Sequence, residues 1–135
     1  MATLISRQDP PDRQPNDGDA PPRATAARHP WAPAPRVTIR LDFVCGSRVG
    51  HGKIELLERI ADAGSIARAA HALHMSYPRA LALLAQIDAS LGQPAAIRSA
   101  GGARGGGAAL TDAGRDIVQR YRAVEAAAQR YAETL

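Results

Sequence analysis

The sequence has one cysteine, few aromatic residues and no long apolar run. Cys45 is the lone cysteine, so no internal disulfide can form, and the Cys and His residues lack the spacing of a zinc site. No segment approaches the roughly 18 uninterrupted apolar residues of a membrane helix, and the N-terminus lacks the apolar stretch of a secretory signal. We therefore expect a cytoplasmic protein without a metal, a membrane span or export.

The scarcity of aromatic residues limits how the core can be built. Aromatic residues make up 4% of the 135 residues and apolar residues 45%, so the core must consist of Ala, Leu, Ile and Val. Such a composition favours packed helices over a β-sandwich, and the length suits one domain. Cys45, His51, His71 and His74 suggest no pairing of a nucleophile with a base, so we expect neither an enzyme nor a cofactor.

Proline and charge divide the chain near residue 36. Residues 1–35 contain eight of the ten prolines and equal numbers of Arg and Asp, a composition that predicts a disordered tail. Residues 36–135 contain thirteen Lys or Arg against nine Asp or Glu. This basic surplus favours contacts with phosphates or anionic surfaces.

Apolar periodicity predicts one strand and three helices in the first part of the domain. Alternating apolar residues indicate a strand over 36–44. Helical spacing then predicts helices over 53–63, 66–73 and 76–91. Ser65 and Ser76 are N-cap candidates for the second and third of these helices, and glycines end the first and third.

The last part of the domain is predicted as a hairpin followed by a long helix. Short apolar runs flank the Gly-rich stretch 101–107, which indicates a two-stranded hairpin over 95–110. Thr111 is placed to cap a helix over 112–134. The apolar residues of this helix form a heptad seam, which predicts packing against a second copy. The seam consists of Ile117, Tyr121, Val124, Ala128 and Tyr131.

The order of these elements predicts a mainly α fold with a small β wing, the winged helix-turn-helix, with a long C-terminal dimerisation helix. In this arrangement the third helix can enter the major groove of double-stranded DNA while the wing tip reaches the phosphates. A generic three-helix core with a hairpin and no DNA binding is the alternative.

Short stretches at the helix junctions and in the hairpin resemble one family in their order and separation. They are Gly52-Lys-Ile-Glu-Leu-Leu57, Gly64-Ser-Ile66, Ala69-Ala70, Met75-Ser-Tyr77, Gly101–Gly107 and Leu110-Thr-Asp-Ala-Gly114. Over residues 37–135 the chain resembles the N-terminal domain of ModE-type molybdate-responsive regulators and, more weakly, LysR-type domains. The resemblance implies a dimeric transcription regulator whose recognition helix begins at Ser76-Tyr77. Because ModE-type regulators often carry C-terminal oxyanion-binding domains and this chain ends at Leu135, we expect a regulator without them.

The motif and the resemblance together predict the DNA contacts. Arg79 faces outward early in the recognition helix and can fork onto a guanine edge or a phosphate, and Arg104 lies among wing glycines that admit a phosphate. Tyr77 has two interpretations, contact with DNA or packing across the second helix. Ser65 is expected to be mainly a cap, and Arg98 to be a weaker contact than Arg104 or a structural residue. The predicted set is Arg68, Ser76, Tyr77, Pro78, Arg79, Ala82, Gln86 and Arg104.

Three other hypotheses differ in the partner. The domain can be an interaction module that heterodimerises with a full-length ModE-type relative and modulates its DNA binding. The Gly-rich loop can bind molybdate directly. It can also bind a nucleotide, but it lacks the Gly-Lys-Ser/Thr ending of a phosphate-binding loop and does not lie between a strand and a helix.

Overall fold

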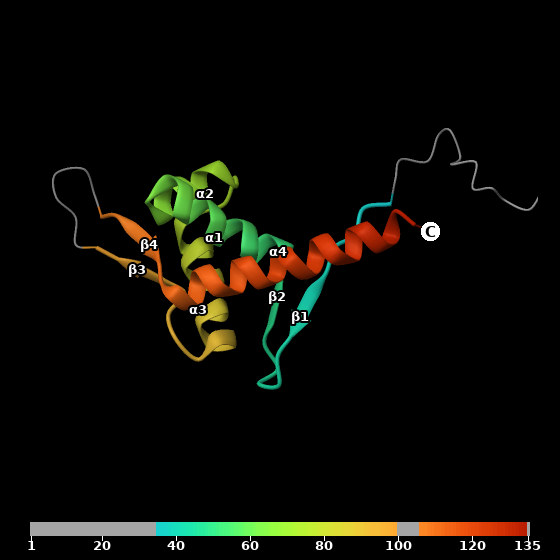
Figure 1. Ribbon diagram of the computed structural model, residues 1–135. Coiled ribbons are helices and arrows are strands. Elements are labelled where there is room, and N and C mark those ends of the chain that lie inside the picture. The colour runs from blue at the N-terminus through green and yellow to red at the C-terminus, as the bar shows by residue number, and fades with distance from the viewer. Residues whose placement is uncertain (1–34, 100–105, 135) are drawn as a thin grey trace, which may run out of the picture. The chain divides into compact units, whose positions relative to one another are not determined.

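The computed structural model describes residues 35–99 and 106–134, which belong to one compact unit (Figure 1). Apart from Pro35, the predicted disordered tail lies outside the described residues, and so does Arg104 of the wing. The elements follow in the order β1 (Arg40–Asp42), β2 (Arg48–Gly50), α1 (His51–Ala63), α2 (Ile66–Ala72), α3 (Tyr77–Leu91), β3 (Ala96–Arg98), β4 (Ala108–Leu110) and α4 (Asp112–Ala132). The mainly helical fold with a small wing is confirmed.

The single strand predicted over 36–44 is wrong in its extent. Strand β1 has three residues and pairs antiparallel with β2, a strand that the sequence analysis missed. The chain turns between them, where the Phe43 amide donates to the Ser47 carbonyl at 2.8 Å and Gly46 adopts a positive φ of 84°. Strands of three residues are too short to show a period of two, so β2 gave no signal.

The predicted helices are confirmed within two residues at each end, because their caps are local. The hydroxyls of Ser65 and Ser76 each accept a hydrogen bond from the amide three residues later at 3.3 Å, and Thr111 does the same at 3.1 Å. Gly64 ends α1 and Gly92 ends α3, both in the left-handed region. Helix α1 begins at His51, two residues before the predicted start, so Gly52 lies in its first turn.

The core lies between the helices and the two hairpins. Buried side chains come mainly from α1, α2 and α3, among them Ile54, Leu57, Ile60, Ile66, Leu84 and Ile87. Helix α4 adds Ile117, which is 7% exposed, and Tyr121, which is fully buried. Tyr121 also donates its hydroxyl hydrogen to the Ile39 carbonyl at 2.7 Å. The prediction that these two residues face a partner is therefore wrong, because they pack inside their own domain.

The wing is fixed to the rest of the domain through Ala95, just before β3. The amide of Ala95 donates to the Asp88 carboxylate at 2.8 Å, and its carbonyl accepts from the Thr111 amide at 2.9 Å. The amide of Ala108 in β4 donates to the Gly64 carbonyl at 2.8 Å. The base of the wing is thus tied to α3, to the start of α4 and to the turn between α1 and α2.

None of the described helices is both long enough and apolar enough to cross a membrane.

Candidate nucleic-acid interface

The outward face of α3 starts at a tight turn after α2. His74 occupies the left-handed region at φ 55°, and the Met75 amide donates to the Ala70 carbonyl at 3.0 Å, so the chain reverses within a few residues. The Ser76 cap then starts α3, with Pro78 in its first turn. Burial of Ala80, Leu84 and Ile87 turns the opposite side of the helix outward, as predicted.

That outward side carries the α3 residues that the sequence analysis selected. Pro78, Arg79, Ala82 and Gln86 are all exposed, and Ser76 and Tyr77 precede them at the exposed start of the helix. Arg68 is exposed on α2. Of the predicted DNA contacts, these seven lie in the described part of the chain, and Arg104 does not.

A hollow lies between α2, the start of α3 and the base of the wing. It is lined by Ser65, Ile66, Ala67, Arg68, Tyr77, Arg98, Ser99, Gly106, Gly107 and Ala108. Within it, Arg98 Nη1 donates to the Tyr77 hydroxyl oxygen at 3.2 Å. The Tyr77 hydroxyl therefore meets the wing, which neither interpretation of Tyr77 predicted, and the residue remains 41% exposed.

Acidic residues are scarce around this hollow. In the sequence, Asp88 is the sole acidic residue between Ala63 and Thr111, and its carboxylate accepts the Ala95 amide on the inner side of the wing. Among the described residues, Arg68, Arg79 and Arg98 form no ion pair. The surface made by α2, α3 and the wing base, which we call the wing face, therefore presents uncompensated positive charge.

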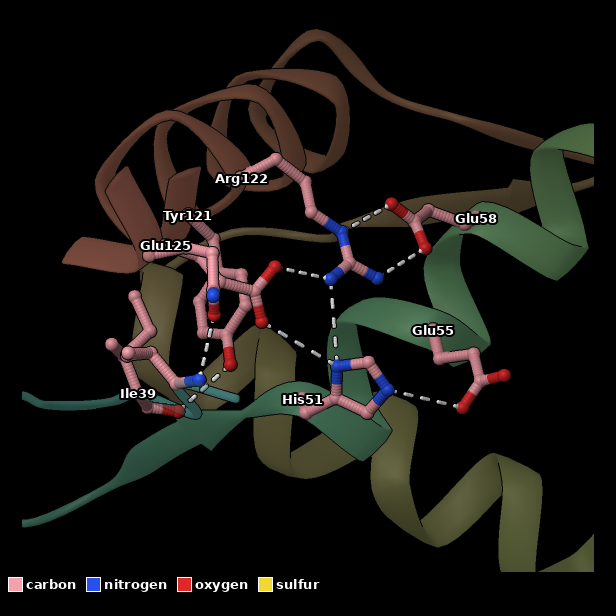
Figure 2. Close-up of polar contacts among 9 residues, drawn as sticks. Ile39, His51, Glu55, Glu58, Tyr121, Arg122 and Glu125 are labelled. Carbon is pink, nitrogen blue, oxygen red and sulfur yellow. Dashed lines mark hydrogen bonds and ion pairs between the residues drawn. The ribbon is translucent and has the colours of Figure 1, made fainter. Parts of the chain in front are cut away.

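Unlike the arginines of the wing face, Arg122 between α1 and α4 forms ion pairs with carboxylates (Figure 2). Its guanidinium donates two hydrogen bonds of 2.7 Å to the Glu58 carboxylate and a third of 2.6 Å to Glu125. His51 lies beside this group, 3.7 Å from both Glu55 and Glu125. The bonds from Arg122 hold the pKa of Glu58 below its ordinary value, and they raise the pKa of Arg122.

The Arg122 group was missed by the sequence analysis and has a structural role. Arg122 and Glu58 are 64 residues apart, so no local spacing signals their meeting. The contacts of Arg122 with Glu58 and of Glu125 with His51 tie α4 to α1. This closely spaced group of charges therefore joins two helices, whereas the arginines of the wing face form no ion pair with a described residue.

Only part of the predicted seam of α4 is exposed to solvent, where a partner could contact it. Val124 is 51% exposed and Tyr131 71% exposed, and Ala128 is partly exposed between them. These three residues follow one another at spacings of four and three, so they form a stripe on one flank of the helix. Figure 1 shows the C-terminal half of α4 extending past the first three helices.

The turn between α2 and α3, the exposed α3 face and the attached hairpin define a winged helix-turn-helix domain. Residues 51–115 match the family model of the bacterial regulatory helix-turn-helix protein, lysR family. The resemblance found in the sequence is confirmed.

Two curated relatives extend this likeness to the ModE type. Molybdenum transport protein ModE of Azotobacter vinelandii is 41% identical over 87 residues, 64% of this chain and 32% of that protein. Molybdenum-pterin-binding protein MopB of Rhodobacter capsulatus is 37% identical over 81 residues, 60% of this chain and 30% of that protein. This chain spans about a third of the length of these relatives.

Among solved structures, the crystal structure of the CbnR_DBD-DNA complex is similar, with 29% identity and a TM-score of 0.49. The similarity covers 62% of this chain and 90% of that chain.

Proposed function

We propose that this chain is a DNA-binding transcription regulator of the ModE type that binds double-stranded DNA as a homodimer. In this proposal α3 enters the major groove and the wing lies against the neighbouring backbone. The observation that carries it is the wing face, where Arg68, Arg79 and Arg98 are exposed and form no ion pair with any described residue. Uncompensated arginines on one rigid face are what phosphate binding requires.

The predicted contacts divide into two roles. Arg79, Ala82 and Gln86 lie on the exposed side of α3 and would read base edges. Arg68, Ser76, Tyr77 and Pro78 lie at the helix starts and would hold the backbone. Arg104 stays a prediction from the sequence, because it lies outside the described residues.

Binding is tested by titrating the protein into a fluorescent 30-base-pair duplex of mixed sequence at two or more salt concentrations. Phosphate-dominated binding must weaken as salt rises, because counterions are released from the DNA. Arg68→Ala should weaken binding, whereas Arg59→Ala removes the same charge from an α1 surface shared with Glu58 and Asp62 and should not. If the protein fails to bind the duplex even at low salt, the proposal is wrong.

The division of roles is tested by selection from randomised duplexes. Arg79→Ala should lose sequence preference, because a base-reading guanidinium discriminates between bases by roughly 1–3 kcal/mol. Arg104→Ala should lower the affinity for all duplexes about equally. Equal loss of preference in both variants would contradict this assignment.

The homodimer is proposed from the exposed stripe of Val124, Ala128 and Tyr131 on α4. A second copy is the partner that offers a matching stripe, because two-fold symmetry brings the same residues of both helices together. A two-fold symmetric operator would then be read by the α3 helices of the two copies. A full-length relative that carries a similar helix is the alternative occupant, and the solution mass distinguishes the two.

A further inference from the structure

The contact between Tyr77 and Arg98 links the recognition helix to the wing. Tyr77 is the first residue of α3, where the Ser76 cap fixes the backbone, and Arg98 is the last residue of β3, where pairing with Ala108 fixes the strand. The two residues are 21 positions apart and their side chains meet at 3.2 Å in the hollow of the wing face. Each end of this contact is therefore anchored to a separate element.

The arginine is the donor in this hydrogen bond and uses one of its five N–H groups for it. Arg98 donates one N–H to the Tyr77 oxygen, and its other four N–H groups have no hydrogen-bond partner among residues 35–99 and 106–134. Among the described residues, no carboxylate lines the hollow, and Ser65, Arg68 and Ser99 add polar side chains to its wall. An arginine with a planar fork of free donors, beside a second arginine and without an acid, matches the chemistry of a phosphate group.

The tyrosine matters because an exposed arginine has many rotamers. A long flexible side chain loses conformational entropy when it binds, and holding it beforehand in the bound orientation reduces that loss. The Tyr77 ring is rigid apart from two side-chain torsions, and its hydroxyl contacts one edge of the guanidinium. The hydrogen bond therefore restricts the rotamers of Arg98, which lines the hollow.

We propose that Tyr77 is a positioning residue that holds Arg98 for contact with a backbone phosphate of DNA at the junction of the recognition helix and the wing. This inference rests on the proposed DNA binding and names a site within it. It changes the expected roles of both residues. Arg98 becomes a phosphate contact, and Tyr77 acts through Arg98 instead of touching DNA itself.

A double-mutant cycle on the full chain tests the inference, with the duplex and salt series described above. Tyr77→Phe removes one hydroxyl and should lower affinity roughly threefold to tenfold, the effect of one hydrogen bond. Its salt slope should stay unchanged, because Arg98 keeps its charge near the DNA. Arg98→Ala should lower affinity by roughly tenfold or more and reduce the salt slope by about one.

The decisive result comes from the double variant. If Tyr77 acts through Arg98, adding Tyr77→Phe to Arg98→Ala should change affinity by less than about twofold, since the partner of the hydroxyl is gone. A full loss from Tyr77→Phe in that background would show that the tyrosine touches DNA directly, and no loss in the parent would show that the contact is idle. Either result overturns the inference while DNA binding stands.

Two controls show whether a loss of affinity comes from the contact between Tyr77 and Arg98, from the loss of one charge, or from unfolding. Arg59→Ala reports the effect of losing one charge away from the wing face, and thermal unfolding of each variant reports whether the domain still folds. Absence of any DNA binding by the parent protein would overturn the proposed function and this inference together. That result differs from binding with additive losses, which overturns the inference alone.

Discussion

Gly114 is the residue at which one added methyl group would disturb the packing most. A side chain at this position would meet the carbonyl group of Ala95 inside van der Waals distance, and that carbonyl is backbone already held by the Thr111 amide. Neither side can move without breaking the attachment of the wing. This close approach gives a physical reason for the Gly in the Leu110-Thr-Asp-Ala-Gly114 stretch.

Gly114→Ala should therefore destabilise the domain despite the better helix propensity of alanine. We expect a loss of about 1–3 kcal/mol in the free energy of unfolding, the usual cost of overpacking, measured by urea denaturation. Gly52→Ala is the matched control. A side chain at Gly52 in α1 meets nothing within 4 Å, so that variant should be neutral or slightly stabilised. Equal behaviour of both variants would contradict the packing argument.

Glu58 gives a second prediction at this scale, through its pKa. The folded domain lowers the pKa of Glu58, chiefly through hydrogen bonds from Arg122, so the ionised carboxylate stabilises the fold. This contribution is present above the ordinary Glu pKa of about 4.3 and is lost as the pH falls through the lower folded value. Unfolding curves from pH 6 downward should show stability falling in that acidic window.

Glu58→Gln should show a shallower loss of stability over the same pH range, because it has no carboxylate to protonate. Asp62→Asn is the control, since Asp62 is an exposed carboxylate on the same helix without an ion pair in the described part of the chain. A pH dependence that Asp62→Asn flattens as much as Glu58→Gln does would show that the Arg122 group is not its source.

At the scale of elements, the segment 35–39 lies along α4 instead of continuing β1. Gln129 holds it with both ends of its amide, accepting the Val37 amide at 2.8 Å and donating to the Pro35 carbonyl at 2.8 Å. The hydroxyl of Tyr121 binds the Ile39 carbonyl further along. One flank of α4 is therefore covered by its own chain, and the stripe of Val124, Ala128 and Tyr131 remains uncovered.

Gln129→Ala should release the start of this segment without unfolding the domain. Hydrogen exchange of the Val37 amide should become faster, because its acceptor is removed, while exchange in α1 stays unchanged. Gln119→Ala is the control, since Gln119 is exposed on α4 and its side chain makes no hydrogen bond with the described residues. Equal exchange at Val37 in both variants would show that the amide contacts are not what protects the segment.

What the sequence could predict follows from the range of the interactions. Ser65, Ser76 and Thr111 cap helices through bonds that span three residues, so the helices and their starts were predictable. The pairing of Arg122 with Glu58, and the insertion of Tyr121 beneath Ile39, join residues 64 and 82 positions apart. A heptad spacing shows which side of α4 is apolar and does not show whether that side meets its own domain or a partner.

For the site, the sequence predicted the exposed residues of α3 and left Arg98 as a weaker or structural candidate. The outward orientation of Arg79, Ala82 and Gln86 follows from helical periodicity alone. The meeting of Arg98 with Tyr77 depends on how the wing attaches through Ala95, which no local pattern contains. The residues of a single helix face were thus predictable, and contacts between elements were not.

At the scale of the whole molecule, burial of one side of α4 in its own domain reduces the area that a second copy could contact. Because Ile117 and Tyr121 lie in the core, the proposed homodimer would use the exposed stripe that begins at Val124 and ends at Tyr131. The stripe is apolar, so one charged substitution in it should be enough to disrupt the pairing, because burying a charge without a partner is costly. The stripe is solvent-exposed in one chain, so the same substitution should leave folding intact.

Val124→Glu should convert a dimer into a monomer in sedimentation equilibrium, and it should still unfold cooperatively, at a temperature that no longer depends on protein concentration. Gln119→Glu adds the same charge on another flank of α4 and should remain dimeric. On a duplex carrying two half-sites, Val124→Glu should lose the affinity gained from linked binding and behave as on a single half-site, where both variants should match the parent. A parent chain that stays monomeric until a longer relative is added would favour the mixed dimer. A Val124→Glu variant that remains dimeric would place the interface elsewhere.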